Sequence, residues 1–215
     1  MATALLTFDE AAHRYVLDGL TLPSVTQVLK GAGLISFDGI PWATLERKRQ
    51  LGTLVHKVTE IFDRGEDLSE YDIPDEVMQY VEGYANFRND CSFFPERIEH
   101  RMMGEISGMK FGGTLDRAGE INGAPHIIEL KTCYTKSPVW GVQMFGYAWA
   151  LAGEKWNRYH RAAVQLSPAV TRGYRIHSYD DPTDSQVFQS ALALVTWKQN
   201  KGLVVTEDVP ERLEL

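Results

Sequence analysis

Hydrophobic residues recur with helical spacing in two long stretches of the chain. Residues 41–62 are expected to form an amphipathic helix, because one face carries an apolar stripe made of Leu51, Leu54, Val55, Val58 and Ile61. Residues 137–151 are almost wholly uncharged and open on Ser137-Pro138, and proline suits the first turn of a helix. The first stretch therefore predicts a helix lying on a core, and the second predicts a buried helix.

Alternating polar and apolar residues predict strands between the helices. The clearest pair contains Asp116 and Glu129, and the turn residues Asn122-Gly123 and Pro125 allow the two strands to fold back on each other. The other expected elements are a hairpin over 5–22, a short helix after Pro23-Ser24, a helix over 75–88, strands over 159–166 and 173–179, and a last helix from Asp181-Pro182 to near Gly202. This order predicts an α/β sandwich in which helices flank a mixed central sheet.

The expected strand pair carries the most informative chemistry. Glu129 and Lys131 are two residues apart and point to the same face of their strand, and Asp116 meets them from the other strand. Two carboxylates and the backbone carbonyl of Leu130 suit a hard cation such as Mg²⁺, beside which Lys131 would orient water or bind a phosphate. An acid two residues before a lysine is also common as a solvated surface pair, so this triplet needs further support.

Support comes from the helix over 41–62, whose Gly52, His56 and Glu60 are spaced four apart and share one face. Gly52 permits close approach of another segment, and His56 has a good nitrogen ligand for the ion held by Asp116 and Glu129. Glu60 either holds the imidazole in one tautomer or pairs with nearby Lys57.

Two polar residues stand on the otherwise apolar helix over 137–151. Gln143 and Tyr147 lie four apart and project from the same face. They either grip a phosphate or stack a base, or they satisfy buried backbone groups. Because they occur together with Asp116, Glu129 and Lys131, the binding role is favoured.

Taken in order, Gly-x-x-x-His-x-x-x-Glu, Gly-x-x-Asp, Glu-x-Lys and Gln-x-x-x-Tyr resemble the RecB-like branch of the PD-(D/E)XK nuclease superfamily. Residues 22–29 and 52–56 are also similar to mitochondrial genome maintenance exonucleases and their phage and bacterial relatives. The resemblance implies a three-layer, restriction-endonuclease-like sandwich with Mg²⁺ or Mn²⁺ as cofactor. It implies further that His56, Asp116 and Glu129 bind the metal, that Lys131 assists the water, and that Gln143 and Tyr147 orient DNA.

The chain departs from many RecB-like nucleases in its cysteines. Such enzymes hold an iron–sulfur cluster with four thiolates, whereas only Cys91 and Cys133 occur here, so we expect no iron–sulfur cluster. The family also has an upstream glutamate that supports the metal site. Glu99 is favoured for this position, with Glu96 as its competitor.

Length and composition bear on the number of domains, the location of the protein and the presence of a membrane span. A length of 215 residues with 44% hydrophobic residues fits one nuclease domain over 1–215, with N-terminal hairpin and helices in 1–95, a catalytic sheet in 96–181 and a last helix and tail in 182–215. We expect a cytoplasmic protein, because the N-terminus has no basic region followed by an apolar run. No membrane span is expected, since the uncharged run 137–153 contains Pro138, Gln143 and Tyr147.

The formal charge of −7 argues against a protein that coats duplex DNA by bulk electrostatics. A narrow channel needs only a few local cations, of which Arg49 and Lys136 are candidates, and aromatic residues such as Tyr134 or Trp140. The sequence therefore predicts a metal-dependent deoxyribonuclease, most simply an exonuclease acting on ends or single strands. A structure-specific or restriction-like endonuclease and a catalytically silent DNA-binding module are the alternatives. A recombination or replication protein is a further candidate partner.

Overall fold

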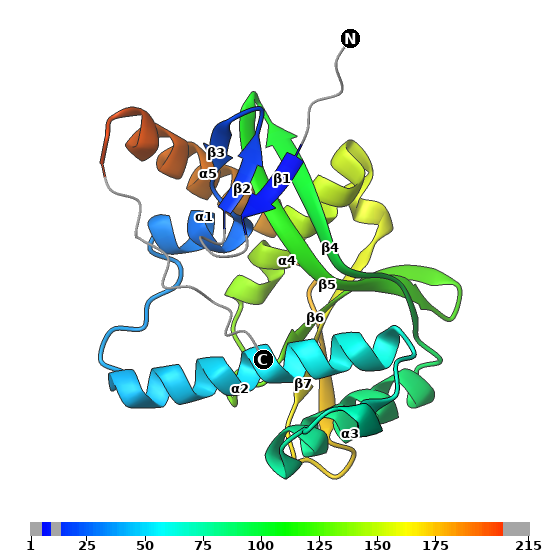
Figure 1. Cartoon of the computed structure of the whole chain (residues 1–215). Helices are drawn as coiled ribbons and strands as arrows, with labels where there is room; N and C mark the ends of the chain where they lie inside the picture. Colours follow the sequence, from blue (N-terminus) through cyan, green and yellow to red (C-terminus); the bar gives the residue numbers. More distant parts are fainter. Residues whose placement is uncertain (1–5, 10–13, 204–215) are drawn as a thin grey trace.

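The computed structural model describes residues 6–9 and 14–203. Its main sheet has five strands in the spatial order β4-β5-β6-β7-β8. They are β4 (Phe94–Ile106), β5 (Met109–Ile121), β6 (Ala124–Lys131), β7 (His160–Leu166) and β8 (Tyr174–Ser178). β6 and β7 run parallel, and the other neighbours run antiparallel, so the sheet is mixed (Figure 1).

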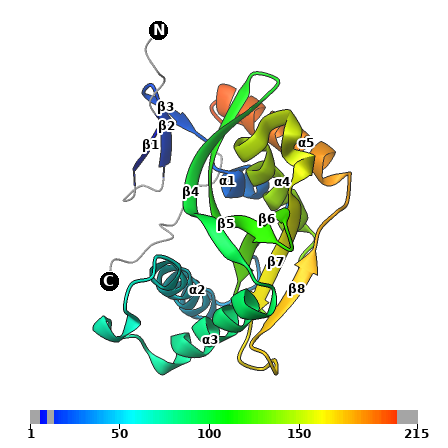
Figure 2. The same ribbon diagram turned by 90° about the vertical axis from the view of Figure 1, so that its right-hand side faces the viewer.

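Helices cover both faces of this sheet (Figure 1 and Figure 2). One face packs against α1 (Val25–Gly31), α4 (Val139–Ala152) and α5 (Asp184–Asn200), and the other against α2 (Trp42–Asp63) and α3 (Asp75–Asp90). Ile127 belongs to the first core, whereas Ile128 and Leu130 belong to the second, because strand side chains alternate between faces. The expected sandwich of a mixed sheet between helical layers is therefore confirmed. Two short 3₁₀ helices complete it: η1 (Leu68–Glu70) and η2 (Gly153–Arg158).

The N-terminal region differs from the simple hairpin expected over 5–22. It forms a separate three-stranded sheet of β1 (Leu6–Asp9), β2 (Arg14–Leu17) and β3 (Leu20–Leu22), while Leu5 and residues 10–13 lie outside the described residues. Positive φ angles of 48° at Asp18 and 84° at Gly19 make the tight turn between β2 and β3. The Tyr15 ring packs on Gly112 of β5, where an added Cβ would clash with it. This contact attaches the small N-terminal sheet to β5 of the main sheet.

The last helix begins later than the sequence suggested. The Asp181 carboxylate accepts hydrogen bonds from the backbone nitrogen of Thr183 at 2.8 Å and from its hydroxyl at 2.7 Å. This local turn takes up the residues after Pro182, so that α5 starts at Asp184. Of the helix and tail expected over 182–215, residues 204–215 lie outside the described residues. Within the part of the chain that the structure describes, no helix has the length and apolar character needed to cross a membrane.

Candidate active site

The site is built where β5 and β6 stop pairing. Their backbone ladder reaches Arg117 opposite Ile128, and Asp116 is the next residue along β5. There the buried Asp116 carboxylate replaces a backbone acceptor, because its Oδ2 accepts a hydrogen bond from the Leu130 nitrogen at 2.7 Å. The turn Asn122-Gly123, with φ angles of 53° and 76°, folds the strands back as expected. Oδ2 thus fixes Asp116 against β6, and the second oxygen, Oδ1, takes no part in this hydrogen bond.

His56 of α2 reaches across to that second oxygen. Its Nδ1 lies 3.4 Å from Asp116 Oδ1 and 3.9 Å from Glu99 Oε1, and its Nε2 lies 3.2 Å from the carbonyl oxygen of Leu130. Burial disfavours the charged imidazolium, but Asp116 and Glu99 outweigh this effect and raise the pKa of His56 to about 10. In the metal-free protein His56 is therefore positively charged near neutral pH.

Glu99 is the acid that β4 brings to the site. The register pairs on either side of it place Glu99 directly opposite Asp116. A nitrogen of His56 and one carboxylate oxygen from each of Glu99 and Asp116 lie within 4.8 Å of one another. Glu96, its competitor in the sequence, is exposed beside the bulge between Pro95 and Arg97. The structure thus groups Glu99, and not Glu96, with the expected ligands.

Glu129 and Lys131 form a second polar group next to this cluster, on the face of β6 that looks toward α4. Lys131 Nζ donates to Glu129 Oε1 at 2.8 Å and to Gln143 Oε1 at 3.1 Å. The Gln143 amide nitrogen donates to Glu129 Oε1 at 2.9 Å and to the Tyr147 hydroxyl at 3.0 Å. Gln143 and Tyr147 are buried, so in this state they position Glu129 and Lys131.

The electrostatics of this second group follow from burial and its neighbours. Burial opposes the charge on Lys131, but Glu129 and Asp116 outweigh it and raise the pKa of Lys131. Burial together with the Asp116 charge raises the pKa of Glu129, against the opposing effects of Lys131 and His56. Glu129 Oε2 is buried and has no hydrogen-bond partner among the described residues. The group therefore contains a lysine whose charged form is favoured, beside a carboxylate oxygen that lacks a hydrogen-bond partner among the described residues.

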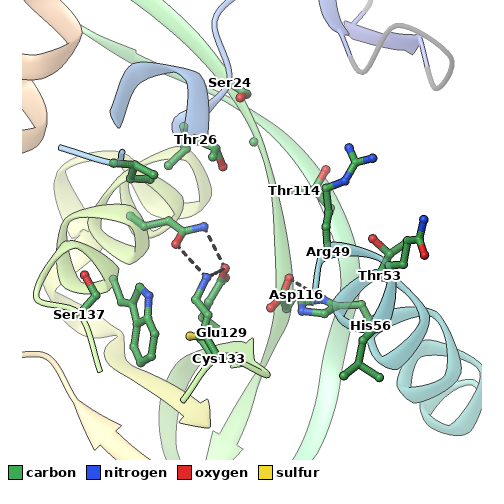
Figure 3. A pocket seen from close by; sticks show the side chains of 18 of the residues that line it. Ser24, Thr26, Arg49, Thr53, His56, Thr114, Asp116, Glu129, Cys133 and Ser137 are labelled. Atoms are coloured by element: carbon green, nitrogen blue, oxygen red, sulfur yellow. Dashed lines mark hydrogen bonds and ion pairs between the residues drawn. The ribbon is translucent and has the colours of Figure 1, made fainter. Parts of the chain in front are cut away.

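Both groups open into one cleft of about 1520 Å³. Figure 3 shows Arg49, Thr53 and His56 of α2 on one side of Asp116, and Glu129 on the side toward α4 and Ser137. Arg49 lines the cleft and pairs with Glu46 at 2.9 Å, whereas Lys136 lies outside the lining, over the Tyr179 ring. Of the two DNA contacts expected from charge, only Arg49 therefore faces the cleft.

Two neighbours of His56 on α2 have different roles. Glu60 pairs with Arg64 at 2.8 Å and with Lys57 at 3.6 Å, which is the second of its two expected roles. A Cβ added at Gly52 would lie 3.3 Å from the Thr132 hydroxyl, so this glycine lets α2 approach the chain just after Lys131.

A buried ion network that was not predicted from the sequence lies behind the site. Arg117 is fully buried and binds Asp63, Glu99 Oε1 at 2.9 Å, the Asp116 carbonyl at 2.7 Å and the Thr59 hydroxyl at 3.1 Å. It thereby joins α2 to the two strands that present Glu99 and Asp116. The available signal was a second charged residue, next to Asp116, in a strand expected to lie in the central sheet.

We expect Arg117→Met to lower the free energy of unfolding by about 3 kcal/mol, because Asp63 and Glu99 would each lose a buried ion pair, while Asp63 would keep its pair with Arg88 at 2.8 Å. Arg172→Met is the matched control, since Arg172 pairs with Asp90 at the surface. Urea denaturation should shift its midpoint strongly for the first variant and hardly at all for the second. Equal shifts would show that the Arg117 network does not stabilise the fold.

Comparison with known proteins supports the fold. No protein-family model matches this chain, and no curated protein sequence matches it. Among solved structures, the chain is similar to a "putative exonuclease" from Eubacterium rectale, with 16% identity and a TM-score of 0.55 over 86% of this chain and 80% of that one. It also matches the structure of SSO0001, with 13% identity and a TM-score of 0.37 over 81% and 86% of the two chains. At such identities the first likeness establishes a shared fold.

Proposed function

We propose that this chain is a divalent-metal-dependent deoxyribonuclease of the RecB-like branch, acting as an exonuclease on DNA ends or single strands. One observation carries the proposal: His56, Glu99 and Asp116 converge beside a buried Glu129–Lys131 pair in a single cleft. Acids converging next to a fixed lysine suit hydrolysis of a phosphodiester, which needs a cation and a positioned positive charge.

The residues present fit a divalent cation. Glu99 and Asp116 stand opposite each other on neighbouring strands with His56 near both, so a divalent cation would take over from the His56 proton the role of offsetting their charges. Glu129 Oε2 is a buried oxygen with no hydrogen-bond partner in the described part of the chain, and a metal would satisfy it. We assign Asp116, Glu129, His56 and the Leu130 carbonyl as metal ligands, with Glu99 in support. The oxygen-rich set favours Mg²⁺ or Mn²⁺.

When bound, the metal would lower the pKa of a water and offset charge on the phosphate. Lys131 keeps its proton at neutral pH, because Glu129 and Asp116 raise its pKa. It therefore acts as a cation that orients the attacking water or holds a phosphate oxygen. Gln143 fixes the position of the ammonium group by accepting from Nζ at 3.1 Å. The Trp140 ring, 5.7 Å from Nζ, covers another side of this ammonium.

Exonuclease action is proposed on grounds outside the geometry of the site. It is supported by the resemblance of the motifs and by the fold shared with the Eubacterium rectale protein. An endonuclease would use the same residues, so the choice depends on the substrate and not on the chemistry.

The test is cleavage of end-labelled single-stranded, blunt duplex and closed circular DNAs by the purified protein with Mg²⁺ or Mn²⁺. We expect linear DNA to be degraded and circular DNA to persist. Chelator and Lys131→Ala should each abolish cleavage, because Lys131 supplies the positive charge next to Glu129. Lys110→Ala is a matched control, since Lys110 lies at the far end of β5 from Asp116.

Each outcome of this panel has a definite meaning. Cleavage of circular DNA would replace the exonuclease with an endonuclease. Metal-independent binding without cleavage of any DNA, from folded protein, would favour the silent binding module. Cleavage that survives Lys131→Ala would show that the reaction takes place elsewhere.

A further inference from the structure

Large apolar side chains gather on the segment between α1 and α2 and on the first residue of α2. Leu34, Phe37, Ile40 and Trp42 are between 37% and 61% exposed. They account for four of the thirteen large hydrophobic side chains that are exposed among the described residues, within only nine positions. We call these four residues the connector patch. Clustered apolar exposure of this kind marks a binding surface more often than scattered exposure does.

The connector patch borders the cleft of the candidate active site. Leu34 and Phe37 line that cleft, as do the neighbouring Ile35 and Ser36. The backbone beneath the patch is held by local hydrogen bonds, from Leu34 to the Leu29 carbonyl at 2.9 Å and from Ile40 to the Phe37 carbonyl at 3.2 Å. The apolar side chains therefore stand on a positioned backbone at the mouth of the site.

The facing surface of α2 has the opposite character. Arg49, Thr53 and Lys57 are spaced four apart on α2 and line the same cleft. Arg49 and Lys57 also pair with Glu46 and Glu60, so this surface is polar and only partly cationic. Lys30 adds a cation on the α1 side, 6.0 Å from the centre of the Phe37 ring. The cleft thus has one apolar border and one polar border with cations.

We propose that the connector patch binds unpaired nucleobases of the DNA strand that is cut, while α2 and Lys30 contact its phosphates. A single strand has this division, with flat apolar bases on one edge and charged phosphates on the other. Paired bases inside a duplex have both faces covered by their neighbours and cannot pack on Leu34 or Phe37, so a duplex offers only its terminal pair. The substrate class is therefore single-stranded DNA or a frayed end. This inference rests on the proposed nuclease function.

The experiment compares binding of three labelled ligands in chelator, which prevents cleavage. They are an oligothymidylate of about ten nucleotides, an abasic strand of the same length and a blunt hairpin duplex. We expect wild-type protein to bind the oligothymidylate about tenfold more tightly than the abasic strand, from base stacking. The double variant Leu34→Ser with Phe37→Ala should lose about this tenfold preference and bind the abasic strand like wild type.

Matched variants separate stacking from folding. Phe37→Tyr keeps an aromatic ring and should keep the preference for bases. Trp197→Ala removes an exposed aromatic residue of α5, which does not line the cleft, and should change nothing. Circular dichroism checks that the half-exposed positions tolerate substitution.

Three results would overturn the inference. They are equal wild-type affinity for the base-bearing and abasic strands, an equal loss for both in the double variant, and tighter binding of the duplex. Metal-dependent hydrolysis of bis(p-nitrophenyl) phosphate, a small ester that needs no base contacts, distinguishes the causes. If the wild type hydrolyses this ester but shows no preference for bases, only the inference about the connector patch fails. If it neither hydrolyses the ester nor binds any strand, the proposed function fails with it.

Discussion

Replacing Asp116 with asparagine should reduce metal-dependent DNA cleavage on the order of a thousandfold while the protein remains folded. Asparagine has nearly the same shape and retains an oxygen that can accept the Leu130 N–H, so the contact between β5 and β6 survives. The lost feature is the negative charge 3.4 Å from His56 and opposite Glu99. Cleavage rates on labelled linear DNA measure the effect, and isothermal titration with Mn²⁺ measures the loss of metal affinity.

Glu96→Gln is the matched control for Asp116→Asn. It makes the same change from carboxylate to amide at an exposed position of β4 that does not line the cleft. Its cleavage rate and metal affinity should equal those of wild type. If Asp116→Asn kept activity within about tenfold of wild type, Asp116 would not be a metal ligand.

Metal affinity should fall by about tenfold for each pH unit below the pKa of His56. That pKa is raised to about 10 in the metal-free protein, so His56 carries a proton at neutral pH, and only the neutral imidazole can bind a metal. Metal and proton compete, which makes binding tighten as pH rises toward that pKa. Because the pKa of Glu129 is also raised, this carboxylate takes up a second proton at lower pH. Metal affinity should therefore fall more steeply with pH in that range.

Calorimetric titration with Mn²⁺ in buffers of different ionisation enthalpy counts the protons released. We expect about one proton per ion near pH 8 and more near pH 6. His56→Gln should remove one released proton at both pH values, because its amide does not titrate. Release of no proton by wild-type protein would show that His56 does not bind the ion.

Local sequence patterns were sufficient to predict much of this structure. The Asn122-Gly123 turn determines how β5 folds back on β6, and the two-residue spacing of Glu129 and Lys131 places both on one face of β6. The apolar stripe of α2 likewise predicted which face packs on the sheet. These features depend on residues close together in the chain, so a short window of sequence contains the information.

The rest depends on contacts between distant segments. Glu99 and Glu96 differ little in the sequence, and only the register of β4 with β5 puts Glu99 opposite Asp116. The strand backbone at Glu99 also has a positive φ of 45°, which no local pattern predicts. Arg117 meets Asp63 across 54 residues of chain, so its ion pair could not be anticipated from spacing.

The alternation of side chains along β6 limits which insertions the protein can tolerate near this strand. Ile128 and Leu130 belong to the core under α2 and α3, while Glu129 and Lys131 belong to the site, so one short strand serves both. A single-residue insertion between Gly123 and Ile128 would exchange the two sets, moving charges into the core and isoleucine into the cleft. The turn at Ser107 and Gly108 joins the far ends of β4 and β5 and has no such constraint. Peptide tags and fluorophores for following the protein in solution therefore belong at this turn.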